Sequence, residues 1–544
     1  MRFLRPLPSF FAAALLLLSS PALAADWYVD ASAPSGGTGS QSSPFSTINA
    51  ALPGLSRGDT VWLASGTYDE TVNIPSLPGS GTTTFRASPG ATPIIDGTSG
   101  SSAAGFVVQT AVADTTFQGL TIQNAVGGAL GIQFYYADGG SVIDCTTKNM
   151  SANAVTFYYS SQGTVTGGTF QGNIAGRKTT GTVVEGNEVY GSSAEGIGLY
   201  DGSTGCTVSH NVIHDNFSVN LYLDSISHSV FDGNLIYESA SGNDLEGIEI
   251  SDEGHYSDLP APVNSYNTII NNVVYGHAEG IVFWLSDEWS TTALNNESGL
   301  RYDIISNNTV INNGVSLKWD ASPAHIGTTI ENNIFASAAG TSPTLLLQAN
   351  SMGGISLDHN LWFAPDLSQP FLWVGNQSDH PGYVTASGGG GGDVLDNPML
   401  AGAWMAPPAQ NLALAMGSPA IGAGVTLAAV TTDFLGALRP SSGTDLGAFQ
   451  LGAKVPADGG AAPPVVDAGA HGTHDAGVTA GKDAGSSRTS SGDAAVARDG
   501  GETPASKTSS GCSCRITGAG GESTTPPVLL MGLALLAVRR KRAR

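Results

Sequence analysis

Short apolar runs recur along most of the chain, and many share one pattern of strand, asparagine and second strand. The repeated asparagines are Asn187, Asn211, Asn234, Asn272, Asn308, Asn333 and Asn360, with equivalent places upstream held by Gly168, Cys145 and Leu120. Asparagine tolerates the left-handed backbone conformation and hydrogen-bonds locally, so it suits a sharp corner where stacked amides bond to one another. The repeat has three short strands and mostly 19 to 27 residues, which predicts a parallel β-solenoid rather than a propeller with blades of ~40 residues.

A further strand precedes each asparagine unit. These strands align as GIQFYY, AVTFYY, NIAGRK, GIGLYD, NLYLDS, GIEISD, GIVFWL, GVSLKW and TLLLQA. Their second and fourth places are almost wholly apolar, so the alternation of period two directs these side chains into the core. The third and fifth places then face outward.

The two ends of the chain differ in composition from the repeat region. Residues 1–24 contain Arg2 and Arg5, an apolar stretch and a small-residue exit, the pattern of a secretory signal peptide cleaved after Ala24. Residues 453–510 contain no Phe, Tyr, Trp, Leu, Ile or Met. Such a segment buries too little apolar surface to offset its ordering entropy, so we expect a disordered stalk.

Residues 511–544 contain the motif GCSCR, a polar spacer, the apolar run Pro526–Val538 and the basic end RRKRAR. The apolar run is shorter than the ~20 residues that span a bilayer comfortably, and the basic end is expected to stay cytoplasmic. This tail resembles the MYXO-CTERM sorting signal of myxobacterial surface proteins. The resemblance implies surface anchoring, membrane contact through the tail and processing by a sorting protease near Cys512 or Cys514.

Both ends of the repeat region carry further signals. PFSTINAAL predicts a short amphipathic helix and GDTVWLASGTYDETVNIP two strands around a glycine turn, which together would cap the open end of the stack. The segment from Trp27 to Tyr68 resembles the entry of right-handed parallel β-helices of the pectin-lyase-like superfamily. LALAMGSPAIGAG and TTDFLGALRPSSGTDLGAFQ resemble their C-terminal closing motif. The resemblance implies an all-β, single-stranded right-handed parallel β-helix over residues 25–452. It does not specify the chemistry, because the superfamily holds lyases, hydrolases, epimerases and proteins without known activity.

The outward places of the aligned strands are unusual in composition. They bring aromatic residues beside cations and acids: Tyr135, Tyr158, Arg177, Lys178, Tyr200, Asp201, Tyr222, Asp224, Glu249, Asp252, Trp284, Lys318 and Trp319. Residues 25–452 contain eight Lys or Arg against 37 Asp or Glu, and three of the eight lie on this face. We therefore predict a polysaccharide-binding groove, with the aromatic residues and Lys178 contacting sugar.

Two insertions fall beside the same face. The asparagine interval widens to 38 residues between Asn234 and Asn272 and to 36 between Asn272 and Asn308. The added loops, EGHYSDLPAPVNSYN and DEWSTTALNNESGLR, follow the strands GIEISD and GIVFWL. Insertions on one face of a repeat commonly mark the binding side, so we expect these loops to wall the groove.

Three roles for the groove residues stay open. In a polysaccharide lyase, Asp201, Asp224, Glu249 and Asp252 would bind calcium, while Lys318 or Arg177 abstracts a proton. In an inverting glycoside hydrolase, Asp224 and Glu249 would be the catalytic pair, and one rung and two strand places separate them by roughly 8 Å. In the third reading these residues form cross-rung pairs on a non-catalytic glycan-binding or envelope structural protein. Calcium-dependent pectate lyases have clustered aspartates and a nearby Lys, whereas the next rung here carries Trp284.

Several other classes are disfavoured. The histidines lack a shared metal-ligand spacing, so zinc is not expected. No phosphate-binding loop or serine nucleophile motif occurs, and the acidic composition argues against nucleic acid. Cys145 and Cys206 lie three rungs apart, about 14 Å, too far for a disulfide, and we expect both to be buried. We expect a monomer.

Overall fold

The structure is a computed structural model that describes residues 24–239, 246–252, 264–285, 298–341, 343–351, 353–402 and 412–452. The chain divides into two compact units, Met1–Val466 and Asp467–Arg544, and every described residue belongs to the first. The predicted signal peptide before Ala24, the linker 453–510 and the tail 511–544 lie outside the described residues, so these remain predictions. Within the described residues, no helix combines the length and apolar character needed to cross a membrane.

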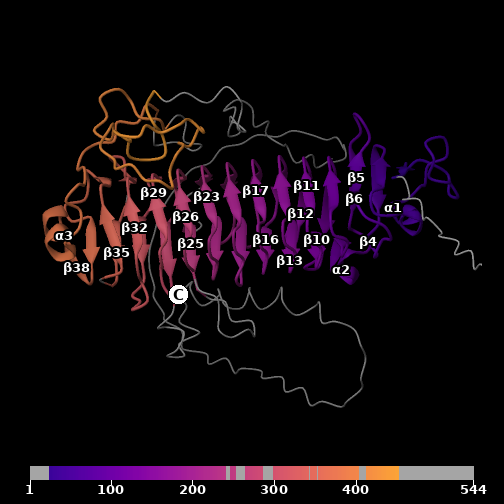
Figure 1. Ribbon diagram of the computed structural model, residues 1–544, viewed down its shortest axis with the longest axis horizontal. Helices are drawn as coiled ribbons and strands as arrows, with labels where there is room; N and C mark the ends of the chain where they lie inside the picture. The colour runs from indigo at the N-terminus through magenta and orange to yellow at the C-terminus, as the bar shows by residue number, and fades with distance from the viewer. Residues whose placement is uncertain are drawn as a thin grey trace, which may run out of the picture. The chain divides into compact units, whose positions relative to one another are not determined.

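Each coil of the chain contributes one strand to each of three sheets, and successive coils stack in chain order (Figure 1). Sheet 1 consists of β1 (Asp26–Val29), β2 (Thr60–Leu63), β5 (Thr83–Ala87), β8 (Thr115–Gln118), β11 (Ser141–Ile143), β14 (Thr164–Thr166), β17 (Val183–Glu185), β20 (Thr207–Ser209), β23 (Val230–Asp232), β26 (Thr268–Ile270), β29 (Ile304–Ser306), β32 (Thr328–Glu331) and β35 (Ile355–Asp358). Sheet 2 consists of β3 (Gly66–Asp69), β6 (Pro93–Asp96), β9 (Thr121–Ala125), β12 (Thr146–Met150), β15 (Thr169–Gln171), β18 (Glu188–Tyr190), β21 (Val212–His214), β24 (Leu235–Tyr237), β27 (Val273–Tyr275), β30 (Thr309–Ile311), β33 (Ile334–Ala336) and β36 (Leu361–Phe363).

Sheet 3 contains the strands that the sequence alignment placed before each asparagine unit. It consists of β4 (Val72–Ile74), β7 (Phe106–Thr110), β10 (Leu130–Tyr135), β13 (Val155–Tyr158), β16 (Ile174–Arg177), β19 (Ile197–Tyr200), β22 (Leu221–Asp224), β25 (Glu246–Ser251), β28 (Glu279–Trp284), β31 (Val315–Trp319), β34 (Leu345–Ala349), β37 (Phe371–Trp373) and β38 (Asn376–Ser378). Its strands pair in parallel, apart from the antiparallel pair of β37 with β38. The helices are α1 (Ile48–Ala51), α2 (Ser101–Ala104) and α3 (His380–Ser387), with the 3₁₀ turn η1 (Leu52–Gly54). The all-β class with stacked parallel coils is confirmed.

The N-terminal region departs from the predicted cap in one respect. Helix α1 has only four residues, and Thr47 caps it by accepting a hydrogen bond from the backbone N–H of Ala50. The segment predicted to form two strands forms β2, β3 and β4 instead, one strand in each sheet. It is therefore the first complete coil rather than a plug, because each of its strands continues a parallel ladder.

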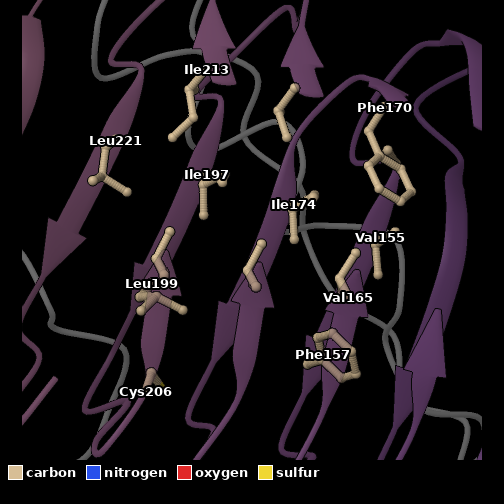
Figure 2. Close-up of a cluster of buried hydrophobic side chains, with 14 of the residues drawn as sticks. Val155, Phe157, Val165, Phe170, Ile174, Ile197, Leu199, Cys206, Ile213 and Leu221 are labelled. Carbon is tan, nitrogen blue, oxygen red and sulfur yellow. The ribbon is translucent and has the colours of Figure 1, made fainter. Parts of the chain in front are cut away.

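The core is the interior enclosed by the three sheets. Figure 2 shows side chains from successive coils, among them Val155, Phe157, Ile197 and Leu199, directed into this interior. These are second and fourth places of the aligned strands, and all four side chains are buried. The period-two prediction for sheet 3 is thus confirmed. Burial of each such side chain stabilises the folded protein by ~1.5–3 kcal/mol.

The seven predicted asparagines form one continuous ladder between sheets 1 and 2. In each pair the side-chain Nδ2 donates to the Oδ1 of the next asparagine over 2.9 or 3.0 Å. Each Oδ1 also accepts the backbone N–H of the preceding ladder position, as Asn272 does from Asn234 at 3.0 Å. All seven side chains are buried. The ladder confirms that the asparagine corners of successive coils lie in register.

The conformational reason that the sequence suggested for these asparagines is wrong. The left-handed φ falls on the residue before each ladder position, for example His210 at +54° and Asn271 at +54°. Glycine takes this place at Gly186 and Gly233. The ladder asparagines are selected for their amide hydrogen bonds, and the tight bend is made one residue earlier.

The C-terminal strap, residues 412–452, covers the outer face of sheet 2. Its apolar residues, including Leu412 and Leu446, pack against outward side chains of that sheet such as Tyr275. Asparagines with positive φ at the corners of the coils bind the strap, since Asn307 Nδ2 donates a hydrogen bond to the carbonyl of Asp445 at 3.0 Å. Figure 1 shows this orange segment alongside the later coils. The segment that resembles a C-terminal closing motif therefore packs on the outer side of sheet 2.

The two cysteines of the repeat region are free and buried, as predicted. Burial raises the pKa of the Cys145 thiol to about 12. It also raises the pKa of Cys206. Both side chains therefore serve as small apolar residues.

Candidate functional site

The outward residues of sheet 3 form two neighbouring columns that run across the coils. The first column contains Gln133, Thr156, Ala175, Gly198, Tyr222, Glu249, Val282 and Lys318. The second contains Tyr135, Tyr158, Arg177 and Tyr200, followed further on by Asp224, Ser251 and Trp284. Most of the predicted site residues thus share one face, although their burial and partners differ along it.

Four tyrosines form a platform at the N-terminal part of this face, which we call the tyrosine platform: Tyr135, Tyr136, Tyr158 and Tyr159. The rings of Tyr135 and Tyr158 stack with centroids 5.4 Å apart, and those of Tyr136 and Tyr159 stack at 4.9 Å. Within each coil the two rings meet edge to face at 4.7 Å. Tyr136 is 58% exposed. The platform therefore presents rigid aromatic surface to solvent, of the kind that stacks on sugar rings.

Two cations border the tyrosine platform. Lys178 Nζ lies 5.3 Å from the ring centroid of Tyr159, within cation–π range. Arg177 is the register partner of Tyr158, and its Nη1 lies 2.6 Å from Asp201 Oδ2. Its guanidinium also lies 5.6 Å from the ring centroid of Tyr200. Arg177 thus places a positive charge beside the tyrosine platform, and its predicted role as a general base stays a prediction.

Tyr136, Tyr159 and Lys178 each occupy a left-handed corner directly after a strand of sheet 3. Their φ angles are +54°, +49° and +50°, and Asp201 and Ser225 follow in the same column at +52° and +56°. A left-handed residue costs roughly 1–2 kcal/mol when it is not glycine. Two bulky tyrosines at such positions are an outlier of the kind that accumulates at functional sites.

Tyr200 and Tyr222 do not present their rings as predicted. They are only 6% and 1% exposed, and their ring centroids lie 5.6 Å apart in a small cluster with Ala175 and Val219. The Tyr222 hydroxyl accepts a hydrogen bond from Ser251 Oγ at 2.8 Å. The prediction that these two rings are open to sugar stacking is therefore wrong. They fasten three neighbouring strands to one another from outside the core.

Tyr200 is buried because it folds back along its own strand. Its hydroxyl donates to Glu195 Oε2 at 3.2 Å and accepts from Asn173 Nδ2 at 3.4 Å. A Cβ placed on Gly198 would lie 1.9 Å from that hydroxyl oxygen. Glycine at position 198 is what allows the ring to lie flat on the sheet.

The predicted acidic residues lie on or near this face but are buried. Asp224 and Glu249 are 5% and 0% exposed, and Ser225 Oγ donates to Asp224 at 2.9 Å. Asp252 accepts the backbone N–H groups of Asn264 and Gly299, and burial raises its pKa to about 7. Asp252 therefore joins backbone segments of adjacent coils and does not line the groove.

The four predicted calcium ligands are not gathered at one point. Among the residues that the structure describes, no group of three or more His, Cys, Asp and Glu side chains is placed to hold a metal ion. Asp201 is paired with Arg177 and Asp252 with backbone groups. The prediction that these four carboxylates form one cluster is therefore wrong, whereas calcium itself as a cofactor stays an untested prediction.

Lys318 occupies a different register from the predicted one. It pairs with Val282 in the column of Glu249 and not with Trp284, and its Nζ lies 2.6 Å from Glu279 Oε1. Trp319 points inward and is fully buried, with 0% of its surface exposed, so its predicted role in sugar binding is wrong. Trp284 is half-buried on the outward face.

Sequence reasoning missed Tyr136, Tyr159, Glu195 and Glu279. The first two were signalled by the doublets YY in successive aligned strands, where the sixth place follows the outward fifth. Glu279 and Glu246 are register partners at the start of their strands, a place outside the aligned six. The predicted walls of the groove are residues 253–267 and 287–301, and of these the parts 253–263 and 287–297 lie outside the described residues.

These features define the class of the protein as a parallel β-helix with an aromatic and charged outer face on one sheet. The chain matches the family model described as a right handed beta helix region, over residues 104–217 and 175–335. A comparison with curated protein sequences finds no match.

Three solved structures are similar in fold. A structure of XylC in complex with xylose has a TM-score of 0.53 at 11% identity, covering 79% of this chain and 99% of that one. Pectate lyase Pel9A gives 0.46 at 15% identity, over 79% and 97%. The mannuronan C-5 epimerase AlgE6 A-module of Azotobacter vinelandii gives 0.44 at 14%, over 64% and 93%. The likeness to the XylC structure, at 11% identity, supports the fold and assigns no activity.

Proposed function

We propose that the outer face of sheet 3 binds an acidic polysaccharide. The observation that carries this proposal is the tyrosine platform bordered by Lys178, with Arg177 held beside it by its ion pair with Asp201. Aromatic rings contact the apolar faces of sugars, and fixed cations contact their carboxylates. XylC, which shares the fold, was solved in complex with xylose.

The net negative charge of the chain opposes the approach of an acidic glycan, so binding depends on direct contacts with cations. The formal net charge is −24 at pH 7, so a polyanion is repelled at long range. Salt screens that repulsion beyond ~8 Å at physiological ionic strength, whereas the attraction of a cation in direct contact persists at that ionic strength and weakens as more salt is added. The few cations of the solenoid are therefore expected to direct an acidic glycan to the part of the face that carries them.

The expected affinity is modest. Each exposed ion pair contributes ~0.2–1 kcal/mol and each aromatic contact ~0.5–1.5 kcal/mol. A few such contacts together correspond to a dissociation constant near ~1 mM. Binding of a long chain that repeats these contacts would be tighter than binding of a short oligosaccharide.

The experiment is affinity electrophoresis and calorimetry of the purified chain with polyuronates and neutral glycans at two salt concentrations. We expect polyuronate binding that weakens with salt and falls roughly tenfold in Tyr136→Ala/Tyr159→Ala. Tyr190→Ala is the matched control, because Tyr190 is a partly exposed tyrosine of sheet 2 that stacks on His214. Equal binding by the platform variant and the wild type would reject the proposal.

A second candidate is catalysis on the bound glycan, by a lyase or an inverting hydrolase. The observation that favours it is the group at the start of β25 and β28, where Glu246 and Glu279 are register partners and Lys318 contacts Glu279. Glu249 lies in the same column as Lys318. Carboxylates beside an ammonium group supply the acid and base functions that both reactions need.

The test for catalysis measures ultraviolet absorbance for unsaturated products and reducing ends for hydrolysis, with and without calcium. A signal in either assay that disappears in Lys318→Ala and Glu279→Gln supports catalysis. Silence in both assays, with glycan binding retained, leaves a binding or envelope protein.

We also propose that the chain is exported and held at the cell surface by its C-terminal tail. The support is the order of basic, apolar and small residues at the N-terminus and of Cys motif, apolar run and basic end at the C-terminus. Fractionation of cells producing the full chain tests this, with a chain lacking residues 511–544 as the comparison. Equal amounts of both chains in the medium would contradict anchoring.

A further inference from the structure

A second exposed aromatic feature lies between sheet 3 and sheet 1. It consists of His228, Tyr266 and Tyr302, which we call the corner strip. The rings stack in sequence, with centroids 4.9 Å apart in both pairs. Tyr266 is 50% exposed and Tyr302 is 42% exposed. None of these residues belongs to the tyrosine platform or to the outward columns of sheet 3.

The corner strip occupies one column of the coil. Bridges join the residues that immediately precede each position, Thr204 to Ser227, Ser227 to Ser265 and Arg301 to Ile326. The backbone N–H of each strip residue donates to the carbonyl of the next coil, as Tyr266 does to Arg301 at 2.9 Å. The stacking distance therefore follows from the strand spacing of ~4.8 Å.

Every position of this column has a left-handed backbone, which makes aromatic residues there costly. The strip residues have φ of +52°, +57° and +58°, and glycine fills the same column at Gly205 and Gly327. A tyrosine in this conformation costs roughly 1–2 kcal/mol relative to glycine. Residues kept in such positions tend to serve a function, since the fold alone is satisfied by glycine.

We propose that the corner strip is a second contact surface for the acidic polysaccharide bound at the tyrosine platform, so this inference rests on the proposed function. Arg301 precedes Tyr302 directly and is one of the few cations in this part of the chain. The strip thus resembles the platform in residue types, with a cation next to an aromatic residue in the chain. Both features follow the strands of sheet 3 on the same side of the coil.

The spacing of the two surfaces selects a polymer as the ligand. Tyr159 follows β13, and His228 and Tyr302 follow β22 and β28, three and five coils further on. At ~4.8 Å per coil this is about 14 to 24 Å. A disaccharide is too short to touch both surfaces, whereas a long chain gains from contacting them together.

The test uses the full chain with the double substitution Tyr266→Gly/Tyr302→Gly. Glycine suits the left-handed backbone, so we expect a melting temperature equal to or above that of the wild type. We expect binding of a long polyuronate to weaken roughly tenfold, while binding of a short oligouronate at the platform is unchanged. Tyr190→Ala, on sheet 2, should alter neither.

Three outcomes would overturn the inference. The first is polymer affinity equal to that of the wild type in the double variant. The second is a fall in melting temperature that accounts for the loss of binding, since it would make the rings structural. The third is a change in sedimentation of the variant without any glycan effect, since the strip would then contact a second copy of the chain. Failure of the platform variant to change oligouronate binding rejects the proposed function instead, so the two failures are distinguishable.

Discussion

Replacement of Asn272 by alanine tests the feature on which the whole face depends, the asparagine ladder. Asn272 lies inside the ladder and is fully buried. Its Nδ2 donates to Asn308 Oδ1 at 3.0 Å and to the carbonyl of Phe231 at 2.9 Å. Its Oδ1 accepts the backbone N–H and the Nδ2 of Asn234 at 3.0 and 2.9 Å. Alanine removes all four bonds at once.

The size of the effect follows from which groups keep another partner. Asn308 Oδ1 still accepts the backbone N–H of Asn272, and Asn234 Nδ2 still donates to Val208. The backbone N–H of Asn234 and the carbonyl of Phe231 lose their contact with the amide. Each buried group left without a partner costs about 1–3 kcal/mol, so we expect a loss of roughly 2–6 kcal/mol.

The assay combines urea unfolding with hydrogen exchange of the Asn234 amide. Repeat arrays can unfold in parts, so the exchange measurement locates the loss at the substituted coil. Asn376→Ala is the control, because Asn376 is exposed in β38 and should change stability by less than ~0.5 kcal/mol. A change in Asn272→Ala as small as in the control, with Asn234 still protected, would refute the reasoning.

Three further predictions concern the strap, the buried tyrosine and pH. Arg439→Met removes buried hydrogen bonds from Nη2 to Asn271 Oδ1 and to the carbonyl of Gly447, each 2.8 Å long. We expect the free energy of unfolding to fall by roughly 3 kcal/mol and proteases to cleave the strap more readily. An unchanged digestion pattern would contradict this. Gly198→Ala should destabilise by ~1–3 kcal/mol by displacing the ring of Tyr200, and adding Tyr200→Ala should recover part of the loss in thermal unfolding. Burial raises the pKa of Asp303 to about 7, above the ~3.9 of an unfolded chain, so the folded protein keeps a proton that the unfolded chain loses. The proton on Asp303 therefore stabilises the fold fully below pH ~4, and this stabilisation falls by up to roughly 4 kcal/mol as pH rises to 7. The free energy of unfolding of Asp303→Asn minus that of the wild type should rise over this pH range. A difference that does not change with pH would refute the prediction.

The sequence by itself determined the coil, the ladder and which side of each strand faces out. These follow from local rules. Alternation of period two fixes which side of a strand faces out, and a buried amide that recurs once per coil finds hydrogen-bond partners in its equivalents on the neighbouring coils. The pattern alone assigns Ile197 and Leu199 to the core and Asn272 to the ladder, and the structure confirms both assignments. The same rules indicated that Glu249 and Lys318 share a face.

Absolute register was decided only by the tertiary structure. Val315, Leu317 and Trp319 alternate with polar places, so a shift of two residues leaves the pattern intact. The aligned strands placed Lys318 opposite Trp284, whereas the structure pairs it with Val282 and turns Trp319 into the core. An insertion before this strand removes the constant interval that would have fixed the register.

Whether each outward side chain is buried or exposed was likewise decided only by the tertiary structure. Tyr200 occupies an outward place and Tyr136 follows one, yet Tyr200 folds onto Gly198 and is buried while Tyr136 is exposed. Alternation gives the side of the sheet but not the neighbours that cover it. Residues many positions apart, such as Asn271 and Arg439 in the strap, meet only through the stacking of coils. The local sequence pattern thus determines the coils and the side of the sheet on which each residue lies. Long-range contacts decide which of the outward side chains a ligand can reach.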